Sequence, residues 1–212
     1  GQAAEIGLDI ISITDHDSVE GIQPALEAAK NFPHLTVIPG VEINTDIPKG
    51  EVHILGYFID YRNPRLNQIL KELRNFRYER GKKIIARLAD MGMNVDWERV
   101  LMLADGGVVG RPHIAQSMFE QGYVSSIREA FDKYIGRNCP AYVERKKVTP
   151  LEAVKLLLDA NGLPFLAHPA DIEPLEPVLL QLKKAGMVGI EIYYNGYTLK
   201  TIEQLEKLAT KY

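Results

Sequence analysis

Four separated apolar runs in this chain each contain or lead into a side chain of a type that binds metal ions. The runs are residues 10–17, 37–43, 51–57 and 164–169, and the side chains are His16, Glu42, His53 and His168. In an α/β barrel, the residue at the C-terminal end of each strand faces the mouth of the barrel. Four such ends would bring together imidazole and carboxylate groups, which divalent transition metals take as ligands. The pattern therefore predicts an α/β barrel with a metal site at its mouth.

A residue of this kind does not by itself require a metal ion. A buried neutral histidine bonded to backbone needs no metal, and this alternative stays open for His53 and His168. His16 has an aspartate on either side, and a carboxylate beside a ligating histidine is a common supporting arrangement. Glu42 would be costly to bury unpaired, so a metal or an arginine is expected beside it. One shared site explains all four positions together.

The rest of the chain alternates short apolar runs with helical patterns, which predicts parallel βα units. Strands are expected at 8–13, 36–43, 51–59, 163–167 and 189–194, and helices at 20–31, 150–160, 174–185 and 198–212. Residues 62–148 interrupt the alternation with helical patterns alone. We expect residues 1–61 and 149–212 to form the barrel core. Residues 62–148 are expected to form a helical insertion whose loops act as a lid over the metal site.

Residues 106–113, Gly-Gly-Val-Val-Gly-Arg-Pro-His, are a candidate anion-binding segment. A glycine-rich approach to a helix N-terminus presents backbone N–H groups to an anion, and Arg111 adds a bidentate phosphate donor. A surface loop with an ordinary helix cap is the alternative, and it stays open. Tyr193 and Tyr194 end an expected strand, where they would either pack inside the barrel or stack on a base.

Composition limits the other classes of protein. The net charge of −3 gives no support for nonspecific binding to nucleic acid or to a membrane surface. No apolar run approaches the roughly 20 residues of a membrane span, and no signal peptide is visible. The single cysteine, Cys139, cannot form a disulfide within the chain. We therefore expect a cytoplasmic protein.

The motifs resemble those of a known family. Residues 13–21, Ile-Thr-Asp-His-Asp-Ser-Val-Glu-Gly, resemble the second motif of the polymerase and histidinol phosphatase (PHP) family of metal-dependent phosphoesterases. Residues 39–43, Pro-Gly-Val-Glu-Ile, match its third motif. Residues 53–57, 110–115 and 167–169 are similar to the branch that acts on nucleotides and short RNA, which also carries a helical insertion. The resemblance covers essentially the whole chain, with five motifs in the family order.

The resemblance implies a distorted (β/α)7 TIM-like barrel that holds up to three divalent metals, commonly manganese, iron or zinc. It implies that Glu42 bridges two metals, that His53 and His168 complete the second, and that His16 binds the third. The first His-x-His motif of the family belongs before residue 1, and its last Asp-x-His motif belongs after residue 212. The first barrel strand and the C-terminal end of the barrel are therefore expected outside this chain.

The activity implied by the resemblance is hydrolysis of phosphomonoesters or phosphodiesters in nucleotides or short RNA. Examples are 3′,5′-bisphosphonucleotides and the substrates of 5′-3′ exonucleases. Arg111 and His113 would bind the substrate phosphate and take part in catalysis. The expected partner is a small nucleotide or short oligonucleotide, and neither a long duplex nor a membrane. Two alternatives stay open: a histidinol-phosphate-type phosphatase, which the large insertion disfavours, and a catalytically inactive fragment or binding module.

Overall fold

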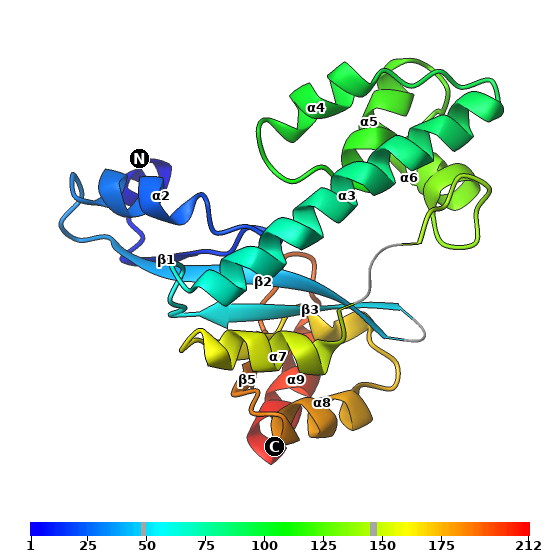
Figure 1. Cartoon of the computed structure of the whole chain (residues 1–212). Helices are drawn as coiled ribbons and strands as arrows, with labels where there is room; N and C mark the ends of the chain where they lie inside the picture. The colour runs from blue at the N-terminus through cyan, green and yellow to red at the C-terminus, as the bar shows by residue number, and fades with distance from the viewer. Residues whose placement is uncertain (48–49, 145–147) are drawn as a thin grey trace. The chain divides into compact units, whose positions relative to one another are not determined.

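The computed structural model describes residues 1–47, 50–144 and 148–212 (Figure 1). The chain divides into two compact units, of which the first comprises Gly1–Leu70 with Lys147–Tyr212 and the second Lys71–Lys146. The helix α3 (Pro64–Asp90) begins in the first unit and continues in the second. The expected role of residues 62–148 as a lid stays a prediction.

The first unit is built on a mixed sheet with the strand order β1-β2-β3-β4-β5. The strands are β1 (Ile10–Ile13), β2 (Thr36–Ile47), β3 (Gly50–Tyr57), β4 (Leu163–Leu166) and β5 (Gly189–Ile190). Strand β1 runs parallel to β2 and β4 runs parallel to β5, whereas β3 runs antiparallel to both β2 and β4. The expected α/β class is confirmed.

The prediction of uniformly parallel βα units is wrong at β3. Only residues 48 and 49 separate β2 from β3. A parallel pair needs a crossover of a dozen or more residues, so two strands this close in sequence can only pair as a hairpin.

The first unit also contains helices and one 3-10 turn. They are α1 (Gln2–Glu5), α2 (Ile22–Ala29), α7 (Pro150–Asp159), a 3-10 turn (Pro169–Asp171), α8 (Leu175–Lys184) and α9 (Leu199–Lys211). Helix α7 lies along the sheet in Figure 1 and contacts β2, β3 and β4. Thr149 starts α7 through a capping box: its Oγ1 accepts a hydrogen bond from Glu152 N, and Glu152 Oε2 accepts one from Thr149 N. None of the described helices is both long enough and apolar enough to cross a membrane.

Strands β2 and β3 alternate between two environments. Their buried apolar side chains include Val41, Ile43, Val52 and Ile54. Because successive side chains of a strand point to opposite faces, the residues between these four share the other face of the hairpin. One face of the hairpin therefore belongs to the core, and the other is available for polar side chains.

Strand β5 is shorter than the sequence predicts, since 189–194 was expected and only Gly189–Ile190 forms a ladder. Within the described residues β5 pairs with β4, which itself ends at Leu166, so the following residues have no strand beside them. Tyr193 and Tyr194 consequently lie after the strand.

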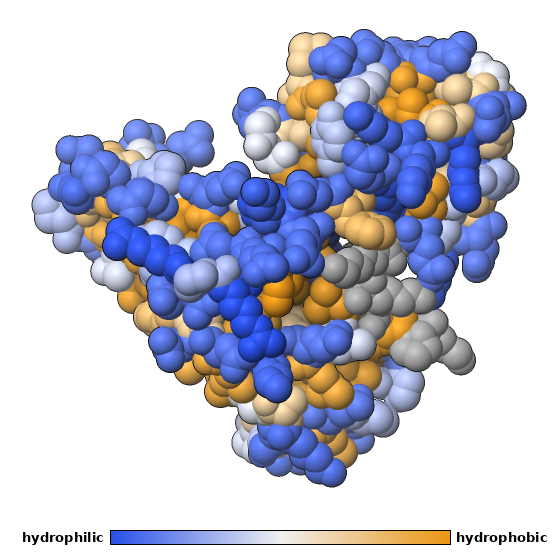
Figure 2. Space-filling view, in the orientation of Figure 1, coloured by the Kyte–Doolittle hydropathy of each residue, from blue (hydrophilic) through white to orange (hydrophobic). Residues whose placement is uncertain are grey.

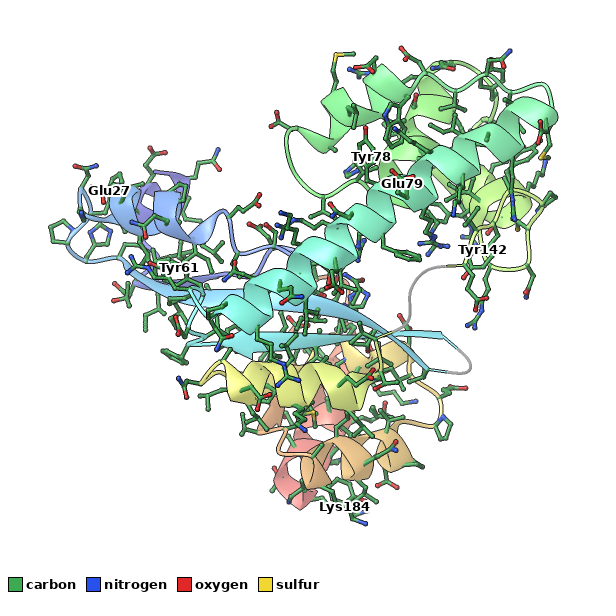
Figure 3. All side chains as sticks on the ribbon, viewed as in Figure 1. Glu27, Tyr61, Tyr78, Glu79, Tyr142 and Lys184 are labelled. Carbon is green, nitrogen blue, oxygen red and sulfur yellow. The ribbon has the colours of Figure 1, made fainter. Side chains whose placement is uncertain are left out.

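The described residues of the second unit form helices and loops and no strand. After α3 it contains α4 (Trp97–Ala104), α5 (Arg111–Glu120), α6 (Ile127–Ala130) and a π-helix (Phe131–Ile135). Its core includes Ile84 and Leu88 of α3, while the side of α3 seen in Figure 2 is mostly hydrophilic. Tyr78, labelled in Figure 3, packs its ring edge-on to Trp97 with the centroids 5.1 Å apart.

Candidate metal centre

Glu42 lies at the centre of a cluster of three histidines. Its Oε1 is 2.7 Å from His53 Nδ1 and 3.3 Å from His168 Nε2. Its Oε2 is 3.4 Å from His16 Nδ1. The two nitrogens that face Oε1 are themselves 3.0 Å apart. Each carboxylate oxygen therefore faces a histidine group of its own.

The pairing of β2 with β3 places two residues of this cluster, Glu42 and His53, next to each other. Glu42 lies opposite Leu55, and Asn44 lies opposite His53. Glu42 and His53 are therefore diagonal neighbours on one face of an antiparallel pair, where side chains are in reach of each other. The prediction that all four residues sit at the C-terminal ends of strands is wrong for Glu42 and His53. They lie within their strands, because the antiparallel hairpin extends past them on both sides.

The other two histidines lie beyond the ends of strands. His16 follows β1 and forms an isolated parallel bridge with Glu42. His168 comes two residues after β4, and its φ of 27° places it in the left-handed region that a side chain rarely adopts. A conformation of this kind is held by its surroundings and recurs at functional sites.

The cluster keeps Glu42 ionised. Burial raises the pKa of Glu42, but hydrogen bonds with His168 and His53 and the charges of His16 and His53 outweigh burial and lower the pKa to about 2. The hydrogen bond with Glu42 raises the pKa of His168 against the opposing effect of burial. A carboxylate that is deprotonated over the ordinary pH range is in the state that a metal ligand requires.

Two residues that the sequence analysis did not single out support the cluster. Asn44 Nδ2 lies 3.0 Å from His16 Nδ1 and orients that ring, while Asn44 N donates a hydrogen bond to Asp17 Oδ1 at 3.1 Å. Glu191 Oε2 accepts a hydrogen bond of 2.7 Å from the backbone N of His168. Asn44 carried a readable signal, since strand periodicity places it on the face of Glu42, whereas Glu191 follows a short apolar run as many solvated glutamates do.

The cluster opens into a pocket of about 410 Å³ that lies entirely within the first unit. Its lining residues are Thr14, His16, Glu42, His53, Leu55, Tyr57, Ala167, His168, Glu191 and Tyr194. A metal lies about 2.0–2.2 Å from each nitrogen or oxygen ligand, so two ligand atoms of one ion lie within about 4.4 Å of each other. The distances around Glu42 satisfy this limit. The donor set and its spacing fit divalent ions.

Arg111 and His113 belong to the second unit, where they share the first turn of α5. The Arg111 guanidinium lies 5.5 Å from the Phe131 ring centroid and 5.8 Å from that of Tyr142, which Figure 3 labels. Both are cation–π distances. His113 Nδ1 accepts a hydrogen bond from Gly110 N, so the neutral ring carries its proton on Nε2, and burial lowers the pKa of His113. Their expected role in binding phosphate stays a prediction.

The chain is similar in sequence to enzymes that act on nucleotides and RNA. No protein-family model matches it. The 5′-3′ exoribonuclease Rnm of Salmonella typhimurium is 34% identical over 169 residues, which make up 79% of this chain and 58% of that protein. The 3′,5′-nucleoside bisphosphate phosphatase of Chromobacterium violaceum is 29% identical over 197 residues, or 90% of this chain and 68% of that protein. The chain therefore spans little more than half of the exoribonuclease.

A solved structure has a closely similar fold. The crystal structure of a provisionally assigned metal-dependent phosphoesterase from Bifidobacterium adolescentis superposes on this chain with a TM-score of 0.87 and 25% sequence identity. The match covers 99% of this chain and 76% of that one.

Proposed function

We propose that this chain, whose relatives and structural neighbours indicate a PHP-like family of metal-dependent phosphoesterases, carries the metal centre of a hydrolase that acts on phosphoesters of nucleotides or short RNA. The observation that carries the proposal is Glu42, because its two carboxylate oxygens face separate histidine groups. A carboxylate placed in this way is suited to bridge two cations. The names of the two relatives support the substrate class.

His53 and His168, with Glu42, would be ligands of one ion, and His16, with Glu42, would be a ligand of another. Imidazole and carboxylate donors suit manganese, iron and zinc alike, so the donor set supports all three. Up to three ions are proposed for the intact protein, in line with the family that the motifs resemble.

The chemistry divides between the ions and the protein. Bound divalent ions lower the pKa of water and stabilise charge on phosphoryl oxygens. Glu42 and the histidines would hold the ions, and Glu191 fixes the backbone of His168. Arg111 is proposed to donate two hydrogen bonds to the substrate phosphate, and the Nε2–H of neutral His113 to donate a third.

The wider fold is part of the same proposal. We infer that the mixed sheet belongs to a distorted (β/α)7 barrel. The parallel pairs β1–β2 and β4–β5, with helices against the sheet, support that architecture. Residues 62–148 would supply a lid that carries Arg111 and His113.

The test uses the intact protein, with bound metal counted and hydrolysis measured on 3′,5′-bisphosphonucleotides, on 5′-phosphorylated short RNA and on histidinol phosphate. We expect Glu42→Gln to lose bound metal and to lower kcat by more than about 100-fold, because even residues that only support metal ligands cost about 10- to 100-fold. Glu27→Gln is the matched control, since Glu27 is an exposed carboxylate on α2 of the same unit (Figure 3).

Arg111→Ala should mainly raise KM, by about 10- to 100-fold, if the contact is equally strong in the ground and transition states. Near-normal kcat and full metal content in Glu42→Gln would contradict the bridging role. Turnover of histidinol phosphate without turnover of nucleotides would favour the alternative phosphatase.

A further inference from the structure

We propose that Tyr194 forms a stacking surface for a nucleobase of the substrate, directly beside the metal pocket. This inference rests on the proposed function and adds a second subsite to it, one that recognises the base while the metal centre takes the phosphate.

Tyr194 lines the same pocket as Glu42 and the histidines. Its ring centroid lies 5.2 Å from that of His168, and His168 Nε2 in turn lies 3.3 Å from Glu42 Oε1. A single imidazole therefore separates the tyrosine ring from the carboxylate at the centre of the cluster. A group that stacks on Tyr194 would be adjacent to a phosphate at the metal centre.

The surroundings of Tyr194 hold its ring in place. Tyr197 N donates a hydrogen bond of 3.1 Å to Tyr194 O, which closes a turn after β5. The Tyr197 ring lies 5.3 Å from the Tyr194 ring, and the Tyr197 hydroxyl accepts a hydrogen bond of 3.0 Å from Ala170 N. The ring of Tyr194 is thereby supported from the segment that follows His168.

The same contacts leave Tyr194 exposed. His168 is tilted by 45° to the ring and Tyr197 by 55°, so neither lies flat against it. Tyr194 remains 49% exposed although it lines a pocket. An aromatic ring presented in this way is what single-stranded nucleic-acid binders use as a platform for bases.

Neighbouring Tyr193 provides a contrast. It is 70% exposed, and its hydroxyl donates a hydrogen bond of 2.8 Å to Glu206 Oε1 on α9. Tyr193 is not among the residues that line the pocket. Of this adjacent pair, Tyr194 alone combines an exposed ring with a place beside the cluster.

Stacking determines the class of ligand. Every base has a π-face, so Tyr194 would accept purines and pyrimidines and would read no hydrogen-bonding edge. It would discriminate against phosphoesters that carry no base. The geometry thus points to nucleoside phosphoesters of either base type, in preference to simple sugar phosphates.

The experiment compares two substrates on the intact protein with manganese added. One is adenosine 3′,5′-bisphosphate, and the other is the same ribose bisphosphate without its base. Tyr194→Ala should raise KM for the nucleotide by about 5- to 150-fold, the range that base stacking on an aromatic ring is worth. It should leave the base-free substrate unchanged. Tyr194→Phe keeps the ring and should behave as wild type, as should Tyr193→Ala.

Metal content and thermal unfolding are measured on every variant, so that damage to His168 is recognised. Equal losses on both substrates, or a wild-type KM for the nucleotide in Tyr194→Ala, would overturn the inference. If the wild-type protein hydrolyses neither substrate, the proposed function fails by itself. Equilibrium binding of the nucleotide and of its base-free analogue to the same variants then tests whether Tyr194 binds the base.

Discussion

At the scale of single residues, Glu42 illustrates how an acid inside a strand stays charged. Burial disfavours its ionised form, and hydrogen bonds together with nearby positive charge reverse that effect. His53 and His168 supply hydrogen bonds to Oε1, and the charge of His16 acts on Oε2. The histidines that offset the cost of burying this charge are therefore the same groups that would hold a metal.

Glu191 leads to a prediction at this scale. Glu191→Ala removes the acceptor for the His168 N–H and frees a backbone held at an unusual φ. We expect the affinity for manganese to fall by about 10- to 100-fold, as for other residues that orient a ligand. Glu191→Gln keeps a side-chain oxygen and should stay within a few-fold of wild type. Calorimetric titration of the metal checks both, and an alanine variant that binds manganese as tightly as wild type would refute the positioning role.

At the scale of elements, β3 and α7 approach each other closely because β3 has a glycine at the contact. A Cβ on Gly56 would lie 2.3 Å from Leu157 Cδ2, and Leu157 is fully buried in α7. A contact that short cannot exist, so a side chain at this position has to push the helix away or force Leu157 into another rotamer. The seating of α7 on the sheet depends on this absence of a side chain.

We therefore predict that Gly56→Ala lowers the free energy of unfolding by about 1–3 kcal/mol, the usual cost of overpacking a core. Urea unfolding measures the change. In the double variant Gly56→Ala, Leu157→Ala, the clash is absent. Its loss of unfolding free energy should therefore be smaller than the sum of the losses in the two single variants. Strict additivity would show that the close contact is not the cause.

At the scale of the whole molecule, the candidate ligands all belong to one of the two units. His16, Glu42, His53 and His168 come from the first unit, and the second has a hydrophobic core of its own that includes Ile84 and Leu88. A ligand that binds only the folded state stabilises the part of the protein whose unfolding releases it.

Manganese should therefore protect the first unit preferentially. At a concentration of about 100 times Kd, the expected gain is about 2.7 kcal/mol. Hydrogen exchange read by segment should show slower exchange in β2 and β3 and unchanged exchange around Ile84 and Leu88. Equal protection of both units would mean that they unfold as one cooperative body.

Much of the site could be predicted because the four ligand-type side chains stand next to apolar runs, where an unpaired polar group is costly. The direction of β3 could not be predicted in this way, because an apolar run reads the same in a parallel and an antiparallel strand. Glu191 was missed because a lone glutamate after a short run resembles an ordinary solvated one. Tyr193 and Tyr194 looked alike in sequence, and only the turn after β5 separates their surroundings.

The alternation of β2 and β3 also limits how this chain can change over evolution. A substitution on the hairpin changes one side chain and its contacts, but the loss or gain of one residue within β2 would turn every later side chain of the strand to the opposite face. Glu42 would then exchange places with a core residue such as Val41, and both the packing and the candidate ligands would fail together. Changes in length should therefore be confined to connections between elements, and a survey of natural variants should find the number of residues within β2 and within β3 constant.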